Sequence, residues 1–139
     1  MKKIDNIVDR EDILEGYWDK DSYNDKWPGG TRLFENVPLS VLEELVGMRF
    51  LDLEECQNDS PTTKEFMGFM QKWDKPSIQV RAHGYVVSSE RPDSRITVEG
   101  LQILLNEGQQ EILDPRFIKA WWSFNKDADE LTETWSWWD

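Results

Sequence analysis

The hydrophobic positions change their period along the chain, and this change predicts segments of different secondary structure. In SPTTKEFMGFMQKW, residues 60–73, apolar residues recur at the three- and four-residue spacing of one helical face. Ser60 and Pro61 are types that favour a helix N-cap and first position, so they predict where this helix begins. The apolar face of the helix consists of Phe66, Phe69, Met70 and Trp73.

Similar signals predict further helices. In PLSVLEELVG, residues 38–47, Pro38 suits the first turn and Gly47 suits the position just past the end. Asp114 and Pro115 again provide a cap and a first residue, for the apolar segment DPRFIKAWWSFNK. A short helix is expected in REDILEGYW, residues 10–18, and a long polar loop follows it.

Between residues 77 and 105 the period becomes two, which is typical of strands. Segments 78–88 and 95–104 alternate apolar and polar residues around the turn sequence SSERPDS, so they predict an antiparallel hairpin. Gly100 interrupts the second segment, and the apolar residues after it follow in a shifted phase. A β-bulge is therefore expected there.

The C-terminal segment 130–138 alternates as well and predicts a strand. Its phase places Trp135 and Trp137 in the core with Leu131, and it places Trp138 on the opposite, polar face. Segment 48–54 is a further candidate strand.

These elements predict one α+β domain over residues 1–139, with an antiparallel sheet of about three to five strands and helices packed on one face. The expected order is a helix and long loop in 1–36, helices in 37–76, and a hairpin, helix and terminal strand in 77–139.

Charge limits the classes of function. The chain has 16 basic and 28 acidic residues, a net charge of −12. Such a surface repels nucleic-acid phosphates and anionic membranes, and it attracts cationic partners. The single cysteine excludes an intrachain disulfide, and neither a secretory signal nor an apolar run of membrane-spanning length is visible. We therefore expect a cytoplasmic protein and, as partner, a basic protein.

Candidates for catalysis are weak. Cys56 and His83 are the only residues of their types, and Cys56 lies in the acidic segment EECQND, which disfavours a thiolate. The acid cluster of Asp52, Glu54, Glu55 and Asp59 lacks the spacing of a calcium loop. No phosphate-binding loop, hydrolase or metalloprotease motif is present, so we predict no cofactor and no metal site.

The polar face of the hairpin is the strongest candidate for a ligand site. Arg81, His83, Tyr85 and Arg95 would gather there if the register is favourable, and they could bind a carboxylate, a phosphate or an acidic loop. The alternative is that they pair with acidic groups of the helices.

Three tryptophans are candidates for partner contacts. Trp18 and Trp27 flank the long acidic loop, and Trp138 lies on the polar face predicted for the terminal strand. Aromatic side chains are enriched at the energetic centres of protein interfaces.

The preferred hypothesis is a small non-enzymatic module that binds a basic protein, for example an immunity protein that blocks a toxic nuclease. One alternative is a small-molecule binder or enzyme that uses Arg81, His83, Tyr85 and Arg95. The other is a homo-oligomeric structural module that pairs through Trp138 and the terminal strand.

Overall fold

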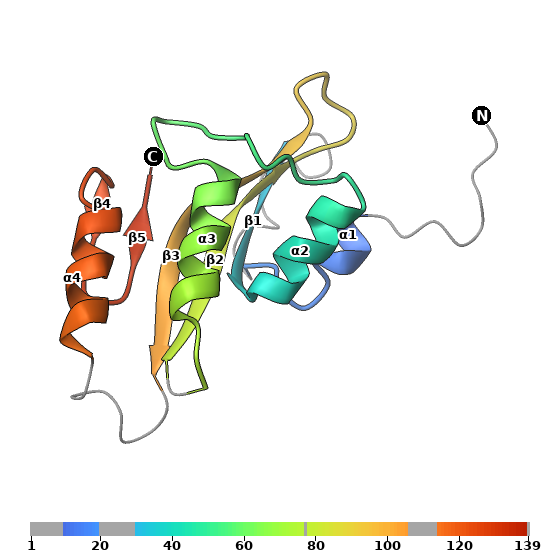
Figure 1. Ribbon diagram of the computed structural model, residues 1–139. Coiled ribbons are helices and arrows are strands. Elements are labelled where there is room, and N and C mark those ends of the chain that lie inside the picture. The colour runs from blue at the N-terminus through green and yellow to red at the C-terminus, as the bar shows by residue number, and fades with distance from the viewer. Residues whose placement is uncertain (1–9, 20–29, 77, 106–113, 139) are drawn as a thin grey trace.

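The computed structural model describes residues 10–19, 30–76, 78–105 and 114–138 (Figure 1). They form the single α+β domain that the sequence predicts, with a three-stranded antiparallel sheet, a two-stranded sheet and four helices. The strands are β1 (Thr31–Val37), β2 (Ile78–Val87), β3 (Arg95–Leu105), β4 (Glu130–Leu131) and β5 (Ser136–Trp137). The helices are α1 (Arg10–Ile13), α2 (Leu39–Gly47), α3 (Thr63–Trp73) and α4 (Pro115–Phe124).

The predicted hairpin is confirmed, because β2 and β3 pair from Ile78 opposite Leu105 to Val87 opposite Arg95. The register shifts by one residue between His83 and Gly84, so that Glu99 is the extra residue of a bulge. The bulge predicted at Gly100 therefore lies one residue earlier. Gly100 has a different role, since a Cβ there would collide with the carbonyl oxygen of Ser136.

The third strand of the main sheet is β1, at the other edge of β2. Segment 48–54, the candidate strand, forms turns instead, so that prediction is wrong. A tight turn ends α2 here: Phe50 N donates to Leu45 O at 2.8 Å, and Arg49 N donates to Val46 O at 3.0 Å. The backbone of Arg49 in this motif is left-handed, with φ 63°.

The terminal strand is also different from the prediction. A turn in which Thr132 N donates to Trp135 O divides the predicted strand into β4 and β5, which pair with each other. The segment also lies along the free edge of β3, where Trp138 N donates to Glu99 O at 2.8 Å and Ile103 N donates to Thr134 O at 2.9 Å. The chain terminus thus extends the sheet, but through a short and interrupted strand.

The helices begin where capping residues allow. Asp114 accepts a hydrogen bond from Arg116 N at 2.8 Å ahead of Pro115, so the predicted start of α4 is confirmed. The cap of α3 is Thr62 rather than Ser60, because Thr62 and Glu65 form a reciprocal capping box. Pro38 precedes the first residue of α2, and Gly47 is the last helical residue rather than the one beyond it.

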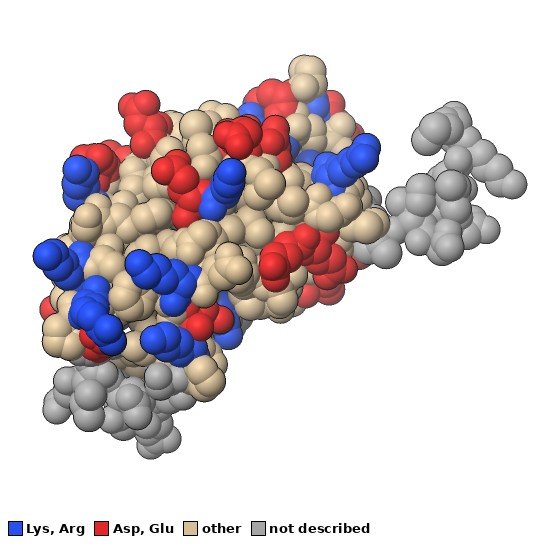
Figure 2. Space-filling model, in the orientation of Figure 1, with Lys and Arg blue, Asp and Glu red and all other residues tan. Residues whose placement is uncertain are grey.

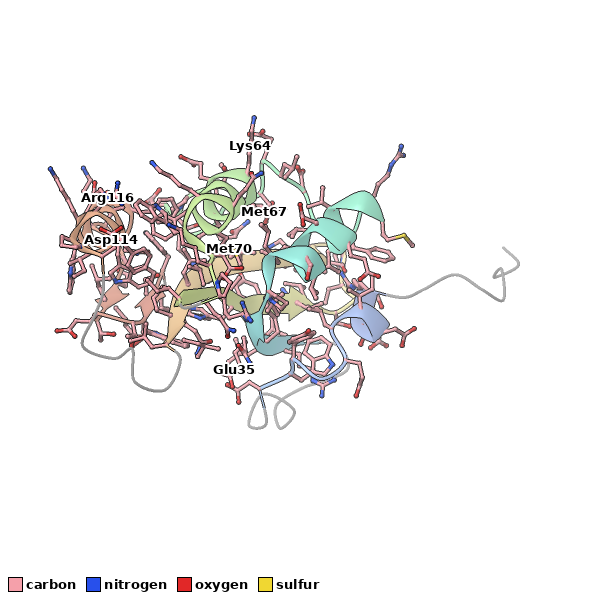
Figure 3. The ribbon with its side chains drawn as sticks, turned by 60° about the horizontal axis from the view of Figure 1, so that its bottom comes forward. Glu35, Lys64, Met67, Met70, Asp114 and Arg116 are labelled. Atoms are coloured by element: carbon pink, nitrogen blue, oxygen red, sulfur yellow. The ribbon has the colours of Figure 1, made fainter. Side chains whose placement is uncertain are left out.

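Helices α2 and α3 cover one face of the sheet, and α4 stands beside α3 over the C-terminal segment (Figure 1). Figure 3 shows Met70 between α3 and the sheet, whereas Lys64 projects away from it. The predicted apolar stripe of α3 is confirmed: Phe66, Phe69 and Met70 are buried, and Trp73 is half-buried. In the part of the chain that is described, no helix has the length and apolar character needed to cross a membrane.

The tryptophan phase of the terminal strand is opposite to the prediction. Trp138 is 2% exposed and packs edge-on against Phe66 with ring centroids 5.5 Å apart, whereas Trp135 and Trp137 lie on the other face. The polar residue in phase with Trp138, Ser136, is buried because its hydroxyl accepts from Leu101 N at 3.1 Å. Because a backbone group provides the hydrogen bond of its hydroxyl, Ser136 can point into the core, and the alternation of polar and apolar residues in the sequence cannot reveal this.

Candidate functional site

The centre of the hairpin's outer face is a stack of three aromatic rings. The ring centroid of His83 lies 3.8 Å from that of Trp135 and 5.3 Å from that of Trp137, and the imidazole is nearly parallel to both indoles. The histidine is 1% exposed. The indoles therefore cover the imidazole, and His83 is not available to a partner on this surface.

His83 is held in its neutral form. Its Nε2 lies 2.6 Å from the carbonyl oxygen of Ser136, which can only accept, so Nε2 carries the hydrogen. Burial lowers the pKa of His83 to about 4, and the hydrogen bond to Ser136 offsets part of that effect. Nδ1 has no hydrogen-bond partner among the described residues. These properties suit a residue that holds the C-terminal segment on the sheet.

The other three residues predicted for this face lie on either side of the stack. Arg81 is 3.6 Å from Asp74 at the end of α3 and donates to Gln79. Towards the turn of the hairpin, Arg95 donates to the hydroxyl of Tyr85 at 3.0 Å. The four predicted residues thus share a strand face, but the structure does not assemble them into one site.

Arg95 is already well supplied with acceptors. Besides Tyr85 it lies 3.4 Å from Glu55 and 3.6 Å from Asp93. Partial burial lowers the pKa of Arg95, but the Tyr85 hydrogen bond and the two carboxylates have the larger combined effect and raise it. Tyr85, Arg95 and Trp137 border a shallow hollow of about 300 Å³, which Arg91 and Asp93 also line. Asp93 pairs with both arginines, and Glu55 pairs with Arg95 from outside the hollow. This hollow therefore presents no excess positive charge to an anionic ligand.

The predicted tryptophan contacts have different outcomes. Trp18 is half-buried, with the guanidinium of Arg32 4.2 Å from its ring centroid. Trp27 lies outside the described residues. Trp138 is buried, so the prediction that it faces a partner is wrong, for the reason given above.

The sequence-derived candidates for chemistry do not come together either. Cys56 is exposed, whereas His83 is enclosed by indoles, and no hydrogen bond joins them in the described part of the chain. A search of the described residues for three or more His, Cys, Asp or Glu side chains arranged around a metal position finds no such group.

Beside the end of α2, the structure shows a second hollow of about 550 Å³, which we call the acid-rimmed groove. We use this name for the groove lined by Val46, Arg49, Phe50, Leu51, Asp52, Leu53, Glu55, Ser94, Arg95 and Ile96. Its residues come from the end of α2, the turn that follows and the start of β3. Apolar and polar side chains line it about equally, and the charged ones are Arg49, Asp52, Glu55 and Arg95. A concave surface that combines apolar and polar groups is typical of sites that bind other molecules.

The turn after α2 determines the shape of this groove. Arg49 adopts φ 63°, a left-handed conformation that normally favours glycine, and thereby completes the C-terminal motif of the helix. Leu51 then turns inward and is buried, and Asp52 accepts from Glu54 N at 2.9 Å. Glu55 is held by its ion pair with Arg95. The two carboxylates that line the groove therefore each have an interaction that fixes their position.

Acidic side chains around the groove are exposed and uncompensated. Figure 2 shows acidic groups over α2 and along the upper edge of the molecule. Within the described ranges, five of these side chains form no ion pair: Glu43, Glu44, Asp52, Glu54 and Asp59. Two apolar side chains on the same turn, Met48 and Leu53, are 44% and 37% exposed. Exposed apolar side chains therefore lie within an acidic segment, residues 43–59, in which Arg49 is the single basic residue.

Part of this groove is visible in the sequence. The acidic residues from Asp52 to Asp59 are the visible part, but the sequence alone suggests only a cation-binding cluster or a solvated loop. The apolar part of the lining combines residues near 50 with Ile96, and a pattern along the chain cannot show that these two segments meet.

A comparison with models of known protein families, with curated proteins and with solved structures found no match to this chain. The functional argument therefore depends on the geometry and charge of the structure itself.

Proposed function

We propose that this protein is a small non-enzymatic binding module that captures a basic protein in the acid-rimmed groove. The observation that supports the proposal is the groove itself, a partly apolar hollow in the acidic segment 43–59. Of the carboxylates in this segment, Glu55 pairs with Arg95, whereas the other five have no cationic partner within the described residues. Apolar contact provides affinity there, and the carboxylates select for positive charge and accelerate encounter.

An immunity protein that blocks a toxic nuclease is one concrete form of this function. A nuclease active site is cationic because it binds phosphates, and an acidic surface can occupy it in place of the substrate. The net charge of −12 favours the same class of partner. A cytoplasmic location remains part of this proposal.

The proposal is tested by capture of partners from a native lysate with three forms of the full chain. The wild type is compared with Asp52→Lys/Glu54→Lys, which reverses two charges at the groove. The control is Glu130→Lys/Glu133→Lys, which makes the same change of charge at exposed positions next to β5. Thermal unfolding of each form verifies that it is folded.

We expect the wild type and the control to retain a basic protein at about 0.15 M salt, where charges beyond about 8 Å are screened. The groove variant should lose it. If the wild type retains no protein at this salt concentration, the binding function is wrong. If all three forms retain the partner equally, the groove is not the binding site.

A further inference from the structure

The exposed large hydrophobic side chains of the described residues gather in two places with opposite charge around them. Leu53 lines the acid-rimmed groove, and Met48 directly precedes Arg49, another residue of its lining. Ile118 and Trp122 are 38% and 41% exposed on α4. Since they are four residues apart on a helix, they lie on the same side of it. Leu33, on the outer face of the sheet, belongs to neither pair.

The environment of Trp122 is cationic, although the chain as a whole is strongly acidic. Lys119 is three residues before Trp122 on the same helix, so the two lie on one side of α4. Lys126 follows in the turn directly after the helix ends. Figure 2 shows basic side chains gathered over the half of the molecule that contains α3 and α4. We call this surface the lysine-rimmed face, defined by Lys64, Lys72, Arg116, Ile118, Lys119, Trp122 and Lys126.

The lysines of this face are available for an external partner. Within the described part of the chain, no ion pair involves Lys64, Lys119 or Lys126. Figure 3 shows Lys64 and Arg116 on the solvent side of the helix layer. Arg116 pairs with Asp114 at 3.1 Å and is the exception on this face.

The two surfaces complement each other in both charge and polarity. One is a partly apolar hollow in the acidic segment 43–59, whose six carboxylates outnumber Arg49, and the other is an exposed indole with lysines on the same surface. They lie towards opposite ends of the molecule, with α4 at one end and the turn after α2 at the other (Figure 1). A volume of about 550 Å³ is ample for one indole.

We propose that a second copy of this chain docks its lysine-rimmed face onto the acid-rimmed groove, with Trp122 inserted in the groove. Because the two surfaces differ, the contact is heterologous, and each copy keeps one free surface through which the assembly can grow. The net charge of −12 opposes the approach of two copies at long range. At about 0.15 M salt this repulsion is screened beyond about 8 Å, whereas charge pairs in contact are screened much less.

Sedimentation velocity of the full chain tests this assembly at protein concentrations from about 10 μM to about 1 mM. Two variants each remove one surface: Trp122→Ser alters the lysine-rimmed face, and Leu53→Lys alters the groove. Leu33→Lys is the matched control, because Leu33 has the same 37% exposure as Leu53 but lies on the outer sheet face. Circular dichroism verifies the fold of every form.

We expect the wild type and Leu33→Lys to increase in mass with concentration. Each of the other two variants alone should associate at least about tenfold more weakly, as is typical when a central contact is removed. An equimolar mixture of Trp122→Ser and Leu53→Lys should form a one-to-one dimer and nothing larger. The first variant still offers its groove, and the second still offers its indole.

A wild type that stays monomeric up to about 1 mM would overturn the proposal. So would self-association that either variant leaves unchanged, or a mixture that does not pair. Trp122→Ser also separates this proposal from the proposed function. It leaves the groove intact, so it should weaken self-association at least about tenfold and retain capture of a basic partner.

Discussion

At His83 the chain removes a polar ring from water and encloses it between two indoles, whereas at the acid-rimmed groove it leaves leucine and carboxylates exposed. The first region looks functional in the sequence, because it combines histidine with tryptophan. In the structure its hydrogen bond, its ring contacts and its burial all attach the C-terminal segment to the sheet. The second region has common residue types, but its charges lack partners within the described ranges. The histidine and tryptophans therefore stabilise the fold, and the binding site is proposed at the groove, where carboxylates have no cationic partner within the described ranges.

Truncation of two tryptophans should show the largest difference between buried and exposed regions. We expect Trp138→Ala to lower the free energy of unfolding by about 4 kcal/mol, because the indole is buried against Phe66. Trp122→Ala should change it by less than about 0.5 kcal/mol, since this indole is on the surface. Urea unfolding measures both values. Equal effects would show that the C-terminal segment is not docked as described.

Acid should lower the free energy of unfolding through the titration of His83. The folded protein holds the pKa of His83 at about 4 instead of the ordinary 6.5, so the unfolded chain binds this proton first as the pH falls. His83 therefore costs no stability above pH 6.5, and the free energy of unfolding falls as the pH drops from 6.5 to about 4, by roughly 3 kcal/mol in total.

The matched variant for this prediction is His83→Gln, whose amide can still donate to the carbonyl oxygen of Ser136. Carboxylates titrate in both proteins, so the difference between the two curves of unfolding free energy against pH isolates the histidine. Parallel curves from pH 7 to pH 4 would contradict the lowered pKa.

The smallest expected effect is at the groove, where the backbone of Arg49 is left-handed. Arg49→Gly should raise the free energy of unfolding by about 1 kcal/mol, because glycine adopts this conformation without steric cost. Asn58→Gly, at φ 57°, is the control and should have a smaller effect, because asparagine tolerates this region well. Thermal unfolding compares the two. No gain in the arginine variant would mean that the turn beside the groove is unstrained.

Much of the fold is predictable because its signals are local. Alternation locates β2 and β3 to within about one residue of their observed bounds, and the Asp114-Pro115 pair marks the start of α4. The strand β1 was missed, since its residues lie between a polar loop and a helix. Its partner is β2, whose pairing residues are distant in the sequence.

The candidate site was less predictable for the same reason. Strand alternation correctly places Arg81, His83 and Tyr85 on one face. It does not show that Trp135 and Trp137 cover His83. Nor does it show that Asp74 and Glu55 arrive from other segments to pair with the arginines.

The sequence by itself determined the α+β class, the hairpin, the apolar face of α3, the start of α4, and the acidic composition of the chain. These depend on periodicity, capping and charge, which act over a few residues or over the whole composition. Only the tertiary structure decided which tryptophans are interior, which polar groups are paired and where a partly apolar groove meets unpaired acids. Those properties depend on contacts between segments far apart in the chain, and burial changes both the hydrogen bonding and the pKa of the groups involved.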